Sequence, residues 1–152
     1  LVGYENRAIA DQDFRNDDVD AGELGAGHQV TALYELTLAG GSASLGTVRV
    51  RGHDSRRNQV FELGQPIARE AVAHQLKETG ADLRFAAAVA LGADALRGNR
   101  VGDWSLTAVA DLAQDASEGR DDRLEFVRVL RKAATLEGST RAAYYSQVND
   151  GY

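Results

Sequence analysis

Six carboxylate side chains lie close together near the start of the chain, and they are the first residues whose types suggest chemistry. They are Asp11, Asp13, Asp17, Asp18, Asp20 and Glu23. Clustered oxygen ligands of this kind can hold Ca²⁺, and Asp17, Asp18 and Asp20 are the candidate ligands. Counted from Asp13, however, the sixth residue is not the glycine of an EF-hand loop, and the twelfth is not its glutamate. The sequence therefore favours a solvated loop with turn or helix caps, and metal binding is the alternative.

His28 follows this acidic loop and is the histidine whose position suggests a role. An imidazole that is oriented by an aspartate can act as a general base, but no nucleophile is spaced recognisably around His28. The Gly25-Ala26-Gly27 turn before it lacks the preceding strand and following helix of a dinucleotide-binding motif. We expect the ring to make a structural hydrogen bond to a backbone group or to one of the three candidate aspartates. The pattern predicts no catalytic residue and no cofactor. A metal- or ligand-binding module built from residues 11–23 and His28 is the alternative function.

The composition of the 152 residues narrows the classes of partner. The formal net charge is −6, which disfavours nucleic acid and anionic lipid, because both require a basic surface. The chain has no cysteine, so disulfides, thiolate catalysis and cysteine-type zinc sites are excluded. No apolar run approaches the length of a membrane span. The first residue is Leu1 rather than Met, so we expect a processed chain or a fragment.

Alternating apolar residues predict strands in the first half of the chain. The clearest is 28–39, where the even-numbered positions from 30 to 38 are apolar, and 45–51 and 59–63 follow it after short polar turns. Short turns favour antiparallel pairing. Residues 1–7 read as a further strand, and Pro66 closes the β-rich part. We expect 28–39 to be central and 1–7 to pair in the same sheet.

Helical patterns dominate the second half. They predict helices over 83–97, 106–116 and 121–138, after an ambiguous segment at 67–77. Thr79 with Asp82, and Ser105, have the form of N-terminal caps. Trp104 is expected to act as a hydrophobic staple or core anchor. On the first helix, the residues expected to be buried are Phe85, Val89 and Leu96.

Together these patterns predict an α+β fold, with an antiparallel β-sheet (a partial sandwich) in the first half followed by about three helices. The predicted organisation is a β-rich part at 1–66, a helical part packing on it at 67–138, and a flexible tail at 139–152.

Four phrases carry a resemblance to a known family: LVGYENR (1–7), DDVDAGELGAGHQVTALYEL (17–36), LRFAAAVA (83–90) and LEFVRVLRKA (124–133). In this order they resemble the uncharacterised C-terminal region of bacterial cell-envelope proteins that carry a von Willebrand factor type A domain. The resemblance extends over about residues 1–136. The type A domain of that family lies upstream and binds a divalent metal through an Asp-x-Ser-x-Ser motif. That motif is absent here, because Asp54-Ser55 is followed by Arg56.

The resemblance implies a non-enzymatic accessory domain that acts in scaffolding or in protein–protein interaction. It implies the upstream type A domain or another envelope protein as partner, and the cell envelope or periplasm as location. By analogy with type A domains inserted into a β-sandwich, residues 1–7 would be the strand that re-enters the sandwich, and missing partner strands would leave an open sheet edge.

Overall fold

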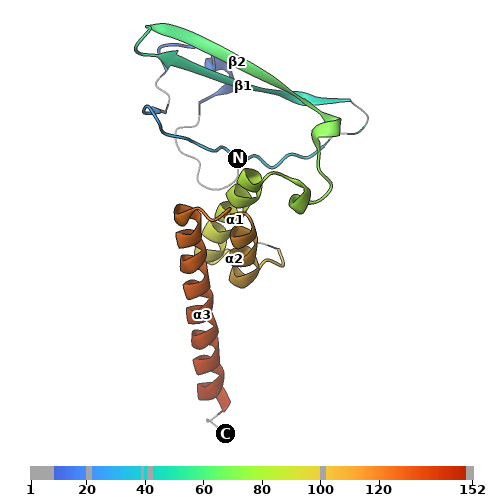
Figure 1. Cartoon of the computed structure of the whole chain (residues 1–152), viewed down its shortest axis with the longest axis vertical. Coiled ribbons are helices and arrows are strands. Elements are labelled where there is room, and N and C mark those ends of the chain that lie inside the picture. Colours follow the sequence, from blue (N-terminus) through green and yellow to red (C-terminus); the bar gives the residue numbers. More distant parts are fainter. Residues whose placement is uncertain (1–8, 20–21, 39, 41–42, 100–101, 150–152) are drawn as a thin grey trace. The chain divides into compact units, whose positions relative to one another are not determined.

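The computed structural model describes residues 9–19, 22–38, 40, 43–99 and 102–149, with side chains described up to residue 138. Internal contacts divide the chain into two compact units, Leu1–His74 and Gln75–Tyr152, called here the N-terminal unit and the helical unit. In chain order, an antiparallel hairpin is followed by three α-helices, which confirms the predicted α+β class (Figure 1). No helix in the described ranges is both long enough and apolar enough to span a bilayer.

The N-terminal unit is built around one β-hairpin. Strand β1 (Ser44–Asp54) pairs antiparallel with β2 (Gln59–Ala68), in the register that places Val50 opposite Leu63. The turn is set by Asp54, whose Oδ1 accepts hydrogen bonds from the amides of Arg56 (2.9 Å) and Arg57 (3.2 Å). Asn58 completes the turn at φ 50°, a left-handed conformation that asparagine tolerates better than most residues. The two strands predicted at 45–51 and 59–63 are thus confirmed.

The sequence predicted that the β-rich part ends at Pro66, and this prediction is wrong. Pro66 lies inside β2, opposite Thr47, and the strand continues to Ala68. Proline has no amide to donate, so it is tolerated in a strand that has a neighbour on only one side. β2 is such a strand among the described residues, because the described sheet consists of β1 and β2 alone. The ambiguous residues beyond Ala68 form two short 3₁₀ turns, η2 (Arg69–Ala71) and η3 (Leu76–Glu78).

The strand predicted at 28–39 is not formed in the described structure. Residues 28–38 have no regular secondary structure, and no backbone hydrogen bond joins residues 29–38 to another described residue. The alternation of apolar side chains was read correctly, but a strand also needs a hydrogen-bonded neighbour. The segment predicted at 1–7 lies outside the described residues, so its pairing stays a prediction.

The helical unit consists of α1 (Ala81–Leu96), α2 (Leu106–Asp115) and α3 (Asp121–Asn149). Small side chains let these helices approach closely. A Cβ atom at Gly92 of α1 would lie 3.0 Å from the side chains of both Leu130 and Phe126 on α3. The fully packed cluster contains Ala88, Leu106, Val109, Ala110, Ala113, Val127 and Leu130.

Of the two predicted helix caps, one is confirmed and one is wrong. Ser105 caps α2 as predicted, its Oγ accepting from the Ala108 amide at 3.1 Å. The N-cap of α1 is Gly80, however, and the Thr79 hydroxyl instead donates to the Leu76 carbonyl at 2.7 Å, which ties Thr79 to the preceding turn.

The buried stripe of α1 also differs from the prediction. Ala88 and Gly92 are buried and Phe85 is half-buried, whereas Val89 and Leu96 are exposed. Counting large apolar residues wrongly placed Val89 and Leu96 in the stripe, because the smallest side chains make the closest contacts here.

Helix α3 extends beyond the predicted end at Gly138 and continues through Asn149. Figure 1 shows its C-terminal turns extending past α1 and α2. Glycine ends a helix when it adopts a left-handed conformation, and Gly138 does not have a positive φ. The flexibility of residues 139–152 and the predicted three-part division of the chain stay predictions.

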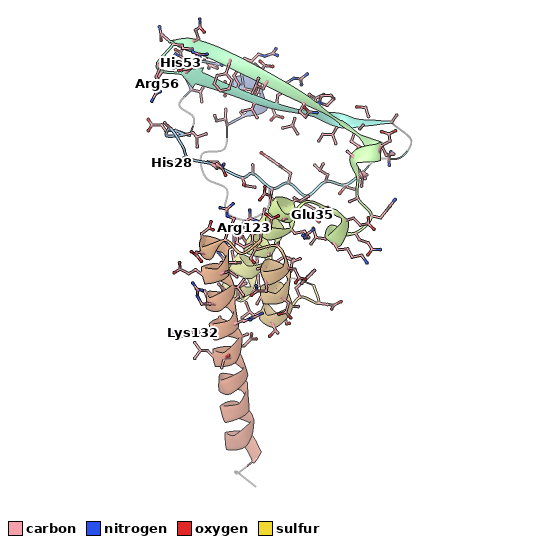
Figure 2. All side chains as sticks on the ribbon, viewed as in Figure 1. His28, Glu35, His53, Arg56, Arg123 and Lys132 are labelled. Carbon is pink, nitrogen blue, oxygen red and sulfur yellow. The ribbon has the colours of Figure 1, made fainter. Side chains whose placement is uncertain are left out.

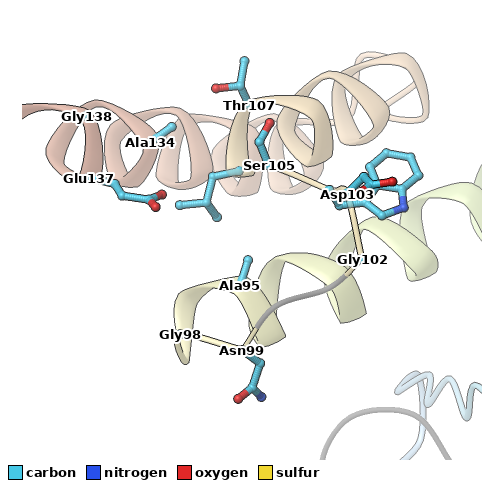
Figure 3. A pocket seen from close by; sticks show the side chains of 12 residues that line it. Ala95, Gly98, Asn99, Gly102, Asp103, Ser105, Thr107, Ala134, Glu137 and Gly138 are labelled. Atoms are coloured by element: carbon cyan, nitrogen blue, oxygen red, sulfur yellow. The ribbon is translucent and has the colours of Figure 1, made fainter. Parts of the chain in front are cut away.

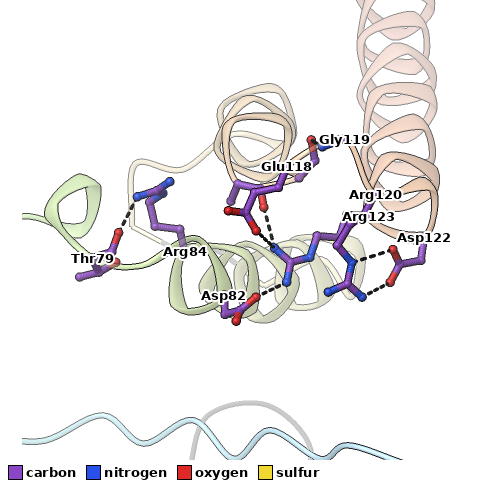
Figure 4. A network of polar contacts seen from close by, with 10 residues as sticks. Thr79, Asp82, Arg84, Glu118, Gly119, Arg120, Asp122 and Arg123 are labelled. Atoms are coloured by element: carbon purple, nitrogen blue, oxygen red, sulfur yellow. Dashed lines mark hydrogen bonds and ion pairs between the residues drawn. The ribbon is translucent and has the colours of Figure 1, made fainter.

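Arg123 fastens the start of α1 to the turn between α2 and α3 (Figure 4). Its side chain is only 7% exposed. One guanidinium nitrogen donates to the Ala116 carbonyl at 2.8 Å, and the other donates to the Asp82 carboxylate. The guanidinium carbon also lies 4.8 Å from the centre of the Phe85 ring, which in turn meets Phe126 edge-on. The hydrogen bond from Arg123 lowers the pKa of Asp82 and keeps that carboxylate ionised.

Replacing Leu130 with alanine should destabilise the helical unit by about 2–5 kcal/mol, because a fully buried leucine leaves a cavity. Leu136→Ala on the same helix is the matched control, since Leu136 is 60% exposed and should change stability by less than about 0.5 kcal/mol. Urea unfolding followed by the helical circular dichroism signal measures both. Equal effects of the two variants would contradict the position of this core.

Arg123→Gln should lower the free energy of unfolding by about 1–3 kcal/mol, because it leaves the buried Ala116 carbonyl without its charged donor. Arg120→Gln is the control: Arg120 forms an exposed ion pair with Asp122 at 2.9 Å, so its loss should have little effect. The same unfolding measurement compares the two variants. An Arg123 variant with an unchanged free energy of unfolding would show that the contacts of Arg123 add nothing to stability.

Candidate functional site

The two faces of the hairpin have opposite chemical character. In an antiparallel pair, residues directly opposite each other share a face. The register therefore places Arg49, Arg51 and Glu62 on one face, called here the polar face. The other face, called here the apolar face, carries Val48, Val50, Phe61 and Leu63. Figure 2 shows the hairpin with its side chains, with His53 and Arg56 near the turn.

The polar face holds part of the acidic loop by two ion pairs. Arg15 donates from Nε and Nη2 to both carboxylate oxygens of Glu62, at 3.0 and 2.9 Å. In the reverse direction, Arg51 of β1 donates to Asp17 of the loop at 2.6 Å. Each partner supplies one cation and one anion, so the loop and the hairpin are joined by reciprocal pairs.

These contacts hold both carboxylates in the ionised form. The hydrogen bond from Arg51 lowers the pKa of Asp17, and the hydrogen bond from Arg15 lowers the pKa of Glu62. The charges of Arg49 and Arg51 lower the Glu62 value further. In each pair one side chain is well exposed, Arg15 at 69% and Asp17 at 64%, so water and salt screen the pairs, and they orient the loop more than they stabilise the unit.

The residues predicted as metal ligands have separate surroundings. Asp17 is paired with Arg51, the amide of Asp18 donates to the Asn16 side chain at 3.1 Å, and Asp20 lies outside the described residues. In the ranges that the structure describes, no three histidine, aspartate or glutamate side chains form a group that could hold a metal ion. The solvated loop stays the prediction, and metal binding stays its alternative.

His28 lies beside the glycine turn as expected, but its ring does not hydrogen-bond to the described aspartates. The His28 amide donates to the Gly25 carbonyl at 3.1 Å, and the ring lies over Gly25, where an added Cβ would be 3.0 Å from Nδ1. The ring makes no hydrogen bond with a described residue, so a bond to Asp17 or Asp18 is not formed. Figure 2 marks its position.

The second histidine, His53, lies near the end of β1, with its Nε2 3.2 Å from the Asn58 side-chain oxygen.

The apolar face is exposed over most of its area. Val48, Val50, Phe61 and Leu63 are 52%, 54%, 43% and 64% exposed. Phe61 lies across Gly52, the residue opposite it, at a distance where any Cβ would clash with the ring, 2.7 Å from Cζ. The alternation in 59–63 indicates that Phe61 and Leu63 share one face of a strand, but it gives no signal that the described structure leaves that face uncovered.

The whole N-terminal unit shares this lack of an interior. None of its described residues is buried, whereas the helical unit contains every buried apolar side chain of the described chain. A two-stranded hairpin is marginally stable on its own and needs a further layer against one face. The exposed apolar face is therefore the candidate functional surface.

The helical unit contains one further recess, between the end of α1, the start of α2 and the middle of α3 (Figure 3). Its volume is about 880 Å³, and its lining includes Trp104, Asp103 and Glu137. Trp104, predicted as a staple or core anchor, is 42% exposed at this recess. No histidine lines the recess, so it offers no imidazole for acid–base chemistry.

Acid should release residues 9–19 from the hairpin before the helical unit unfolds. Because the folded pKa values of Asp17 and Glu62 are lowered, the contribution of their ion pairs is complete above the ordinary carboxyl range near about 4. It is lost as pH falls through the lowered values. NMR titration of the loop amides measures the transition. Asp17→Asn should remove part of it, Asp11→Asn should leave it unchanged, and loop shifts that stay constant in acid would contradict the docking.

Comparison with known proteins identifies the family. The family described as "Uncharacterized protein YfbK, C-terminal" matches residues 1–46 and 39–136. The uncharacterised protein YfbK of Escherichia coli (strain K12) is 32% identical over 151 residues, which cover 87% of this chain but only 26% of that relative. No solved structure matches the chain. The chain therefore belongs to the family of YfbK C-terminal regions.

Proposed function

We propose that this chain is a non-enzymatic accessory region of a longer protein that contains a von Willebrand factor type A domain. It acts in protein–protein contact at the cell envelope or in the periplasm. Its contact surface is the apolar face of the hairpin, and the partner is the remainder of that longer protein, upstream of this chain. The region thereby scaffolds or orients the type A domain.

The observation that carries this proposal is the exposed apolar face in a unit without a buried residue. Four large apolar side chains share one face of a two-stranded sheet, and each is more than 40% exposed. Burying apolar surface stabilises by about 25 cal/mol per Å², so such a face gains stability when another layer covers it. The opposite face already carries the loop through its ion pairs, which leaves the apolar face available.

Two further observations support the choice of partner. The E. coli relative extends far beyond the matched region, since that region is 26% of its length. The phrases at 1–7 and 17–36 resemble the region that follows a type A domain in envelope proteins. An interaction role also agrees with the surface chemistry, because exposed apolar patches are typical of protein contacts.

Charge placed on the apolar face should break this contact. We expect Val50→Lys to weaken binding of the chain to the separately produced remainder of the full reading frame by at least about tenfold, or about 1.4 kcal/mol. Val60→Lys is the matched control, because Val60 lies opposite His53 on the polar face and is also exposed, at 45%. Isothermal titration calorimetry measures both variants.

Two results would overturn the proposed contact surface, and a third would remove the type A domain from the proposal. The first is a wild-type chain that does not bind the remainder of its own protein. The second is an equal loss of affinity for the two lysine variants. The third is a full reading frame without an upstream Asp-x-Ser-x-Ser segment, which would remove the type A domain from the proposal and leave only the contact surface. Recovery of the complete protein from the cytosol after cell fractionation would contradict the proposed location.

A further inference from the structure

Residues 29–38 have the side-chain pattern of a half-buried strand but none of its pairing in the described structure. Figure 1 shows them as an extended trace with no helix or strand. In an extended chain, successive side chains point to opposite sides. The even-numbered side is apolar and exposed: Val30, Tyr34, Leu36 and Leu38 are 78%, 64%, 62% and 45% exposed. The odd-numbered side carries Gln29, Thr31, Glu35 and Thr37, with Leu33 as its one apolar residue.

Among the described residues, the backbone of this segment also lacks hydrogen-bond partners. No backbone hydrogen bond joins residues 29–38 to another described residue. Covering the apolar side would also remove the neighbouring amides and carbonyls from water. Buried backbone groups need partners, and an extended segment finds them all only in a ladder with another strand. Pairing with another strand would therefore satisfy the backbone groups and, within a sheet, cover the apolar side chains.

We infer that residues 29–38 are a strand donated to a β-sheet whose other strands belong to the same longer polypeptide, outside this chain. Its apolar side enters the core of that sheet, and its polar side faces solvent. This inference rests on the proposed function and adds to it the mode of contact, which is backbone pairing. The length of the E. coli relative beyond the matched region provides room for such a sheet, since the match covers 26% of it.

The polar side of the strand supports a sheet that is covered on one face only. A strand buried on both faces reads as a continuous apolar run, whereas alternation is typical of a strand with one solvated face. Glu35 and Thr37 would be costly to bury without partners. The sheet that receives residues 29–38 therefore presents its outer face to water at this strand.

Hydrogen–deuterium exchange on the complete protein and on the isolated 152-residue chain tests the inference. We expect the amides of residues 29–38 to exchange at least about a hundredfold more slowly in the complete protein, because ladder hydrogen bonds open only with the sheet. In the isolated chain they should exchange at close to the rate of an unstructured peptide. Equal exchange in the two samples overturns the inference.

Matched substitutions distinguish a strand with a defined face from protection by general burial. In the complete protein, Tyr34→Lys should reduce the protection of residues 29–38 by at least about tenfold, whereas Thr37→Lys on the polar side should leave it within about threefold. Equal effects of the two variants overturn the assignment of faces.

The remaining outcomes identify other partners for the strand. Protection that is already present in the isolated monomer means that residues 29–38 pair within this chain, and protection that rises with concentration alongside a dimer means a second copy. Either result overturns the inference. If Val50→Lys weakens binding while residues 29–38 stay unprotected in the complete protein, the strand inference fails and the proposed function stands.

Discussion

A two-stranded sheet has no interior, and this constraint governs the N-terminal unit. Neither face of β1 and β2 can be buried by the hairpin itself, so each face needs another layer. The polar face receives the loop at residues 9–19 through reciprocal ion pairs, which tolerate water. The apolar face requires a dry contact that the described residues do not provide. The polar face thus binds a loop of the same chain, whereas the apolar face remains for a contact outside the described residues.

The helical unit satisfies the same requirement within itself. Alanine and glycine at the contact positions of α1 and α2 let the helix backbones come close, and Leu130 and Val109 fill the space between them. Polar contacts at the edge of such a small apolar core add to its stability. Arg123 supplies them by joining a carbonyl, a carboxylate and an aromatic ring that come from different segments.

The sequence predicted what depends on local pattern and failed where the outcome depends on a neighbour. The hairpin strands, the three helices and the Ser105 cap follow from periodicity and capping chemistry, and all are present. Residues 28–39 carry an equally clear strand pattern, yet strand formation needs a second strand that local pattern cannot supply. The α1 face was misplaced because Ala88 and Gly92 carry little apolar weight in a sequence window, although they make the closest contacts.

The candidate surface shows the same division. The alternation at Val48, Val50, Phe61 and Leu63 predicted which side chains share a face. It could not say whether the layer above that face belongs to the chain. The pairing of Asp17 with Arg51 also escaped the sequence, since a loop 34 residues away gives no local signal. The one sequence feature that agrees with this pairing is the opposite charge of the acidic loop and of the arginines in β1.

The position of Trp104 has a spectroscopic consequence. It is the only tryptophan among the 152 residues and sits, half-exposed, in the helical unit at the start of α2. An indole at such a boundary changes its emission wavelength when the surrounding helices separate and water reaches the whole ring. The N-terminal unit contributes no indole, so the tryptophan emission originates from the helical unit alone. One chain therefore carries a fluorophore that reports on a single unit, and the melting of the helices can be followed separately from any change in the hairpin.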